Sequence, residues 1–351
     1  MNRLCLLFAL CALLLISACV PEPITPIYVI EYPATWTPGP TATITPHPPT
    51  ATLVIQRTAG PAPTRDPNVR RLPGAPRGSM GVWLDIGSVQ QESIPLLAPR
   101  AQIFVETEKS DTPRASGNFL LLRVDGSNEN PLPEGLLSRY DGVYVENVPS
   151  NQLAPLREKI APRLVITETS LQDKDAAAAL NENADGICFC NFLRDADAPI
   201  ETYKKEDDWQ RDIETLAELS AEPDAVILTA TRFPEDAAKN FEGMQQWLDY
   251  AAASFLLGVN NSHTFFGFQG KAAQEFLGAP AIVAKIGTPL GAMFKANGVY
   301  QRRFSDGLVV VNPTDEARAF ALSRNYLSVN GTPLSQLELP PHTGMILLSV
   351  K

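Results

Sequence analysis

Eight short apolar runs between residues 82 and 268 constrain the fold of this chain more than any other feature. Within each run the apolar side chains occupy successive positions rather than alternate ones. This pattern is typical of parallel strands, which are buried on both faces when helices cover the sheet. The runs cover residues 82–86, 102–106, 119–125, 142–146, 163–168, 186–190, 225–229 and 263–268.

Helical patterns separate the later runs. Apolar residues recur at helical spacing over residues 209–217 and 241–255, and a weaker alanine-rich stretch covers residues 173–183. Strands alternating with helices predict an α/β fold, a (β/α)8 TIM-type barrel over residues 78–298. An open doubly wound sheet is the alternative. No Gly-x-Gly-x-x-Gly motif follows the first run, however, so a dinucleotide-binding fold has no support.

The pattern changes after Gly298. Short strand-like stretches follow one another, and Ser305-Asp-Gly and Val329-Asn-Gly are hairpin signals because Asn and Gly tolerate positive φ. We expect a small antiparallel β-sandwich domain over residues 299–351. A domain of this size buries little surface by itself, so we expect it to complete its core against the barrel.

The N-terminal region indicates export and a spacer. Residues 1–18 combine a basic start, an apolar run and small residues, which predicts a signal peptide. Residues 16–19 resemble the lipobox of bacterial lipoproteins, in which the cysteine, here Cys19, carries the lipid. Fourteen of the 31 prolines fall within residues 20–77, so residues 19–77 are predicted to be a Pro/Thr-rich disordered stalk. We therefore expect an extracytoplasmic protein that is lipid-anchored to a bacterial membrane.

The net charge and the number of metal-binding residues exclude some classes of function. A formal net charge of −10 argues against a nucleic-acid partner, which needs a basic surface. The three histidines are too few for a His-rich metal site, although a magnesium site built from carboxylates stays open. We predict no metal and no cofactor. Cys188 and Cys190 are close neighbours whose disulfide would be strained, so we expect two unbridged, buried side chains.

Carboxylates stand at the ends of the first five runs. They are Asp85, Glu106 with Glu108, Asp125, Glu146 and Glu168, whereas the later runs end in Cys190-Asn191, Thr229 to Arg232, and Gln269. In a barrel these strand ends meet at one mouth, where the chemistry of this fold is found. Period-two alternation also puts Trp83 with Asp85, and Tyr144 with Glu146, on one face.

A mouth that carries acids and aromatic rings suits a sugar. Glycoside cleavage needs one carboxylic acid for the leaving oxygen and one carboxylate to attack or to activate water. We predict Glu146 as nucleophile or base and Glu168 as acid. Asp85, Asp125 and Asn191 are predicted to bind substrate, and Trp83 and Tyr144 either stack on sugar or belong to the core. We expect Arg123 to pair with Asp125, and His263 to be a hydrogen-bonded core residue.

Four segments resemble glycoside-hydrolase-like TIM barrels with a C-terminal β domain. Tyr140–Asn147 and Ala184–Phe192 are similar to the fourth- and sixth-strand motifs, and residues 249–258 to the helix before the last strand. Residues 300–314 and 340–348 resemble the start and close of the β domain. The resemblance implies a glycosidase that acts on oligo- or polysaccharide.

One position departs from that pattern. Many relatives carry Glu where this chain has Cys190, and a thiol is a poor general acid beside a carboxyl group. Two hypotheses follow. Either Glu146 and Glu168 form the catalytic pair, or the barrel is a non-catalytic carbohydrate-binding or structural lipoprotein.

Overall fold

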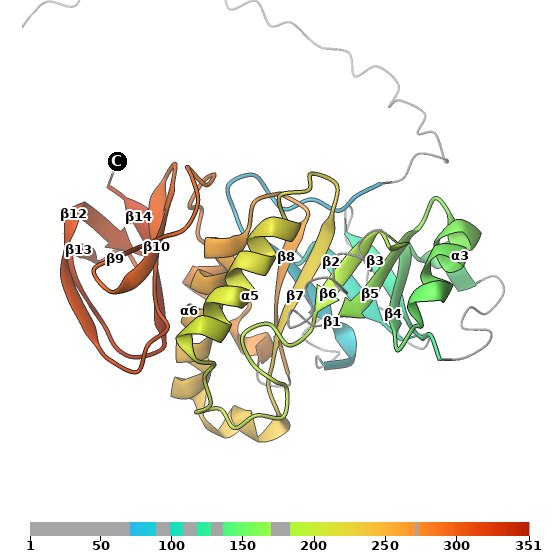
Figure 1. Cartoon of the computed structure of the whole chain (residues 1–351), viewed down its shortest axis with the longest axis horizontal. Helices are drawn as coiled ribbons and strands as arrows, with labels where there is room; N and C mark the ends of the chain where they lie inside the picture. The colour runs from blue at the N-terminus through green and yellow to red at the C-terminus, as the bar shows by residue number, and fades with distance from the viewer. Residues whose placement is uncertain are drawn as a thin grey trace, which may run out of the picture. The chain divides into compact units, whose positions relative to one another are not determined.

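The computed structural model describes residues 71–88, 99–107, 118–127, 136–169, 183–270 and 273–350. Eight parallel strands follow one another around a closed barrel in chain order, which confirms the predicted TIM-type fold (Figure 1). The signal peptide, Cys19 and nearly all of the predicted stalk lie outside the described residues. The strands are β1 (Gly81–Asp85), β2 (Ile103–Glu106), β3 (Phe119–Asp125), β4 (Gly142–Glu146), β5 (Leu164–Thr169), β6 (Gly186–Phe189), β7 (Val226–Arg232) and β8 (Thr264–Gln269).

The continuous apolar runs are explained by two separate cores. One face of each strand fills the barrel interior, where Trp83, Tyr144 and Phe265 lie in one buried cluster. The other face packs under the helices, where Val82, Val143 and Phe266 belong to a larger cluster. Both faces are removed from water, so both alternating sets of positions are apolar.

The two Asp-Gly pairs fix how neighbouring strands begin. Asp141 and Asp185 each accept a backbone N–H of an adjacent strand, from Leu120 at 2.9 Å and from Val165 at 2.9 Å. A Cβ on the following Gly142 or Gly186 would lie 2.4 Å from a backbone oxygen of the next strand. The repeated motif therefore sets the close approach of strands at the base of the barrel.

Long helices cover the later strands. The stripes predicted around residues 209–217 and 241–255 are helices α5 and α6, which lie side by side (Figure 1). The alanine-rich stretch at residues 173–183 lies almost wholly outside the described residues. Within the described ranges no helix is long and apolar enough to cross a membrane. The helices are η1 (Ile86–Ser88), η3 (Leu136–Arg139), α3 (Ser150–Ile160), α5 (Glu206–Leu219), η4 (Glu235–Lys239), α6 (Phe241–Gly258), η5 (Ala273–Phe276) and α7 (Pro280–Val283).

The C-terminal strands form one antiparallel sheet in the order β13-β12-β14-β11-β10-β9. The expected antiparallel domain is confirmed: its six strands are hydrogen-bonded in one order, and the pairing of β12 with β13 shifts register between Ala321 and Tyr326. The sequence-based reading missed β9, whose hairpin turns at Asn297 and Gly298, both with positive φ. The strands are β9 (Phe294–Ala296), β10 (Val299–Phe304), β11 (Gly307–Asn312), β12 (Arg318–Ser328), β13 (Pro333–Leu339) and β14 (Thr343–Ser349).

The β domain completes its core against the barrel, as its size predicts. Helix α6 contacts β14 and β11, and a Cβ on Gly344 of β14 would lie 2.5 Å from the side chain of Ala253. Arg302 of β10 donates to the carbonyl oxygens of Leu257 at 3.0 Å and Val259 at 2.7 Å. This arginine therefore caps the C-terminal end of α6 and ties the two domains together.

Candidate active site

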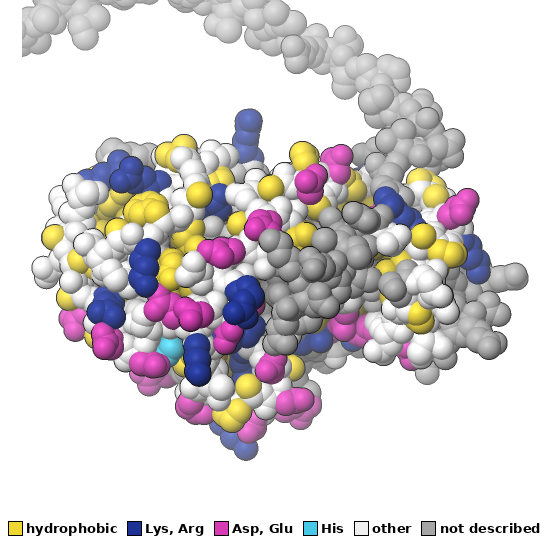
Figure 2. Space-filling model, viewed as in Figure 1, with side chains coloured by type: hydrophobic (Ala, Val, Ile, Leu, Met, Phe, Trp, Pro, Cys, Tyr) yellow, Lys and Arg dark blue, Asp and Glu magenta, His cyan; other side chains and the backbone are white. Residues whose placement is uncertain are grey.

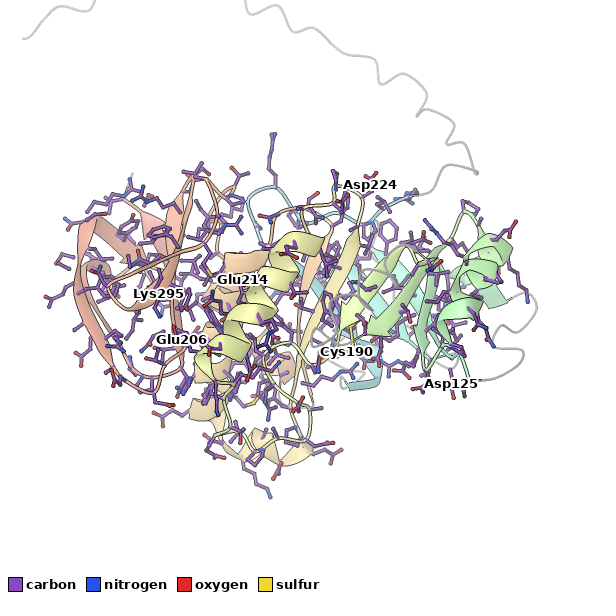
Figure 3. All side chains as sticks on the ribbon, in the orientation of Figure 1. Asp125, Cys190, Glu206, Glu214, Asp224 and Lys295 are labelled. Carbon is purple, nitrogen blue, oxygen red and sulfur yellow. A yellow bond between two sulfur atoms is a disulfide. The ribbon has the colours of Figure 1, made fainter. Side chains whose placement is uncertain are left out.

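The carboxyl ends of the strands gather the polar side chains of the barrel. Figure 3 places Cys190 and Asp125 at one end of the barrel and Asp224, which precedes β7, at the other. On the face drawn in Figure 2, Lys and Arg side chains lie interspersed with Asp and Glu. The candidate site, called the mouth below, consists of Asp85, Arg123, Glu146, Glu168, Arg232 and the tyrosine beneath them, Tyr144.

Glu168 is held by two donors. The Tyr144 hydroxyl donates to its Oε1 at 2.6 Å, and Nη2 of Arg232 donates to the same oxygen at 2.8 Å. These two hydrogen bonds hold the carboxyl group in place. Both donors reach Oε1, and no donor to Oε2 is found among the described residues.

Glu146 has a different environment. Its Oε1 lies 3.4 Å from Nη1 of Arg123, whose Nη2 lies 2.5 Å from Oδ2 of Asp85. Burial raises the pKa of Glu146, Arg123 lowers it, and the charge of Glu168 raises it again, with a raised pKa as the result. The same two carboxylates, Asp85 and Glu146, outweigh the burial of Arg123 and raise the pKa of its guanidinium. Glu146 is thus the mouth carboxyl whose pKa is raised toward that of a proton donor.

The two aromatic residues predicted for the site lie beneath the carboxylates. Trp83 and Tyr144 are fully buried, with ring centroids 6.1 Å apart, and the Trp83 indole donates to the carbonyl of Thr229 at 2.8 Å. Neither ring presents an exposed face for a sugar in this structure. Tyr144 instead acts through its hydroxyl, and burial and the charge of Glu168 raise its pKa well above the usual value.

Cys188 and Cys190 are joined by a disulfide, which corrects the expectation of two unbridged side chains. The two side chains point to the same face of the barrel wall, with their Cα atoms 5.6 Å apart. Sγ of Cys190 lies 2.9 Å from the Tyr144 hydroxyl. The position of the expected sixth-strand acid is therefore occupied by a bridged sulfur beside the tyrosine that binds Glu168.

Three predicted positions lie apart from these contacts. Asp125 is exposed and accepts the backbone N–H of Ser127 at 3.1 Å, a bond that lowers its pKa, so the predicted Arg123–Asp125 pair is wrong. Glu106 points away from the barrel interior and pairs with Arg139 at 3.2 Å. Asn191 follows β6, half-buried, and its carbonyl accepts from Lys204. Glu108 lies outside the described residues.

One arginine and one glutamine at the strand ends had no role assigned from the sequence. Arg232 and Gln269 end β7 and β8 and are aligned with each other in the strand register. Alternation on β7 gives the signal, because Val226, Leu228 and Ala230 face the interior and Arg232 continues that face. Read this way, strand ends other than carboxylates also belong to the mouth.

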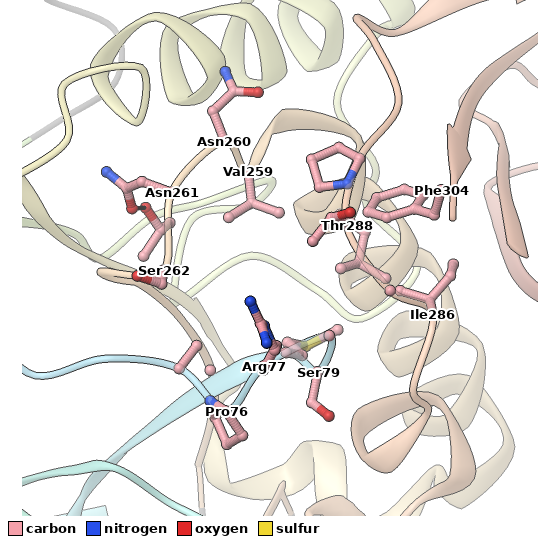
Figure 4. Close-up of a pocket in the computed structure, with 18 of the residues that line it drawn as sticks. Pro76, Arg77, Ser79, Val259, Asn260, Asn261, Ser262, Ile286, Thr288 and Phe304 are labelled. Carbon is pink, nitrogen blue, oxygen red and sulfur yellow. Dashed lines mark hydrogen bonds between the residues drawn. The ribbon is translucent and has the colours of Figure 1, made fainter. Parts of the chain in front are cut away.

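Other possible sites were compared with the mouth. A cavity of about 210 Å³ lies at the opposite end of the barrel, between residues 75–81, Val259–Ser262 and residues 286–289 (Figure 4). Its walls are mostly apolar and it contains none of the carboxylates described above. His263 lies nearby and hydrogen-bonds through Nδ1 to the carbonyl of Pro73, as expected, but it is half-buried rather than a core residue. In the described part of the chain, no group of three or more His, Cys, Asp or Glu side chains is arranged to hold a metal ion.

One family model and several solved structures are similar to this chain. Residues 143–308 match the model of a family described as hypothetical glycosyl hydrolase family 15. No curated relative matches the sequence. Similar solved structures include a GH27 β-L-arabinopyranosidase from Geobacillus stearothermophilus, with 10% identity, a TM-score of 0.44, and coverage of 78% of this chain and 97% of that one. An α-amylase from Geobacillus thermoleovorans, complexed with acarbose, has 8% identity, a TM-score of 0.40, and coverage of 78% and 99%. The family match, together with the barrel and its C-terminal sheet, confirms the resemblance of this chain to glycoside-hydrolase-like TIM-barrel proteins.

Proposed function

We propose that the protein is a glycoside hydrolase that cleaves an O-glycosyl bond of an oligo- or polysaccharide with Glu146 and Glu168. One observation carries the proposal: two carboxyl groups end neighbouring strands and have opposite environments. Burial raises the pKa of Glu146, whereas Glu168 accepts hydrogen bonds from Tyr144 and Arg232. A carboxyl group with a raised pKa beside one that two donors hold in place suits the acid and base roles.

The contacts favour the opposite roles to those predicted from the sequence. Glu146, with its raised pKa, protonates the oxygen of the leaving group. Glu168 uses Oε2 to attack the anomeric carbon or to deprotonate water, while Oε1 stays bound to its two donors. Asp85 supports this arrangement indirectly, because it holds Arg123 against Glu146.

Hydrolysis assays with the full chain test the proposal. A panel of 4-nitrophenyl glycosides and neutral oligosaccharides identifies a substrate, and Glu146→Gln and Glu168→Gln are each expected to lower kcat/KM at least about 10²-fold. Glu338→Gln, at an exposed position of β13, is the control and should leave the rate unchanged. Hydrolysis that survives both mouth substitutions would overturn the assignment.

A non-catalytic carbohydrate-binding lipoprotein is the second candidate. The disulfide at Cys190 favours this function, since many members of the family that the chain resembles carry an acid at that position of the sixth strand. The same assays separate the two functions: binding of an oligosaccharide without product, unaffected by Glu146→Gln, supports the binding protein.

The proposed location is the outer side of a bacterial membrane, with Cys19 as the lipidated residue. The support is the segment Ile16-Ser17-Ala18-Cys19, which resembles a lipobox. Metabolic labelling with a palmitate analogue tests it, because Cys19→Ala should abolish both the label and the membrane fraction. Label retained in Cys19→Ala would exclude this anchor.

A further inference from the structure

Gln269 is a buried side chain at the mouth whose amide donor is unused. The residue is only 4% exposed, yet its Nε2 has no hydrogen-bond partner among the described residues. Buried polar groups are almost always paired, since an unpaired buried donor destabilises a protein. An exception at the end of a barrel strand therefore needs an explanation.

Two observations show that the side chain faces the barrel interior. Phe265, on the same strand, belongs to the inner cluster. A Cβ on Gly267 would lie 2.5 Å from the indole nitrogen of Trp83, so this position also points inward. Side chains alternate along a strand, and Gln269 therefore continues the inward face at the mouth.

The strand register gives its neighbours. Arg232, which donates to Glu168, is aligned with Gln269 across β7 and β8. On the other side Gly81 is aligned with Phe265, and the same register continued to the ends of β1 and β8 puts Asp85 level with Gln269. Gln269 thus lies between Arg232, which donates to Glu168, and Asp85, which pairs with Arg123. The side chain of Gln269 is neutral, whereas those of Arg232 and Asp85 are charged.

We propose that Gln269 is a substrate-binding residue that donates its amide N–H to a hydroxyl oxygen of the sugar ring bound between Glu146 and Glu168. The inference rests on the proposed function for the position of that sugar. A neutral donor matches a hydroxyl group, and the bond replaces the missing protein partner of Nε2 when substrate enters. Because the contact is the same before and during bond cleavage, it lowers KM rather than raising kcat.

The test compares two buried glutamines by replacing each with Met, which has a similar shape. Gln301 of β10 is 7% exposed and its Nε2 donates to the carbonyl of Ala296 at 3.2 Å, so it is the matched control with a partner. Gln269→Met is expected to keep or raise the melting temperature of the sugar-free full chain, whereas Gln301→Met should lower it.

Binding is measured with the best neutral oligosaccharide from the hydrolysis panel. Gln269→Met should raise the dissociation constant of this oligosaccharide and its KM about 5–10-fold at nearly constant kcat. This is the effect of losing one neutral hydrogen bond. Gln301→Met should change neither. A Gln269→Met variant that melts lower and binds the sugar as tightly as the parent would show a structural role and overturn the proposal.

The outcome also separates this inference from the proposed function. If a sugar binds but is not hydrolysed, the glycosidase proposal is overturned, and the effect of Gln269→Met on binding can still be measured. Hydrolysis with unchanged KM in Gln269→Met removes the substrate contact alone. A parent protein that binds none of the sugars removes both.

Discussion

Arginines at the mouth and at the contact between the domains are paired in different ways. Burial lowers the pKa of both guanidinium groups, but Asp85 and Glu146 raise that of Arg123, and Tyr144 and Glu168 raise that of Arg232, so both pKa values end above the usual one. Arg302 is only 3% exposed and is surrounded by neutral oxygens, so burial lowers its pKa to about 10, still well above neutrality. Its donors are used by the carbonyls of Gly291, Leu256, Leu257 and Val259 and by the side chain of Asn260.

The difference indicates what each region does. At the domain contact, one cation satisfies helix-end carbonyls that would otherwise be unpaired, which is a structural task. At the mouth, the cations leave an oxygen of Glu168 and the amide of Gln269 without partners among the described residues. A region whose polar groups are completed only when a ligand arrives is the one suited to bind and convert it.

Replacing the mouth carboxylates by Ala should have the largest effect. Glu168→Ala is expected to lower kcat about 10³-fold or more for any substrate, and azide should restore a product if Glu168 attacks carbon directly. Glu146→Ala should be severe for an oligosaccharide but mild for a 4-nitrophenyl glycoside, whose leaving group needs little protonation. Steady-state kinetics on both substrates measures this contrast. The reverse ranking of the two variants would restore the roles predicted from the sequence.

At the domain contact we expect a large effect on stability and none on the chemistry. Arg302→Met leaves the carbonyls at the end of α6 without a donor and should reduce the free energy of unfolding by about 3 kcal/mol. Urea unfolding measures it, with Arg303→Met on the exposed face of β10 as control. A fall in kcat per folded molecule would contradict the separation between the two regions.

The disulfide should contribute less. Cys188→Ala with Cys190→Ala removes a bridge that closes a very short loop, so the expected loss in the free energy of unfolding is about 1–2 kcal/mol. Urea unfolding of the oxidised parent, the reduced parent and the double variant provides the measurement. If the double variant does not fold, the bridge is a main structural element and this ranking fails.

The smallest expected effect is a shift in a pH profile. Arg123 lowers the pKa of Glu146, so Arg123→Gln should raise that pKa and keep Glu146 protonated to higher pH. The alkaline limb of kcat/KM should therefore move upward, by about one pH unit. Arg211→Gln, on the exposed face of α5, is the control. A shift to lower pH would mean that Glu146 acts as the base.

The fold was largely predictable because strands that are buried on both faces have apolar residues at successive positions of the sequence. All eight barrel strands coincide with continuous apolar runs, and the helices α5 and α6 with helical stripes. The β9 hairpin was missed, although Asn297-Gly298 is a turn signal, because the exposed strand before it has no apolar run.

The site was only partly predictable, because the position of a residue on its strand does not determine which residue of another strand its side chain contacts. Arg123 shares a face with Asp125, yet its side chain crosses to Asp85 on β1 while Asp125 bonds its own loop. Alternation placed Tyr144 with Glu146, but its hydroxyl extends to Glu168 on the next strand. The Arg123–Asp85 contact also depends on the curvature of the closed barrel, which brings the non-adjacent strands β3 and β1 within reach of one another.

The bridge between Cys188 and Cys190 also makes one hydrogen bond of the mouth unidirectional. A disulfide sulfur carries no hydrogen, so it cannot donate to the Tyr144 hydroxyl 2.9 Å away. The single proton of that hydroxyl is donated to Glu168, and Cys190 can act toward the hydroxyl only as an acceptor. A protonated glutamic acid at this position would have added a second donor beside Tyr144, and the oxidised sulfur removes that donor.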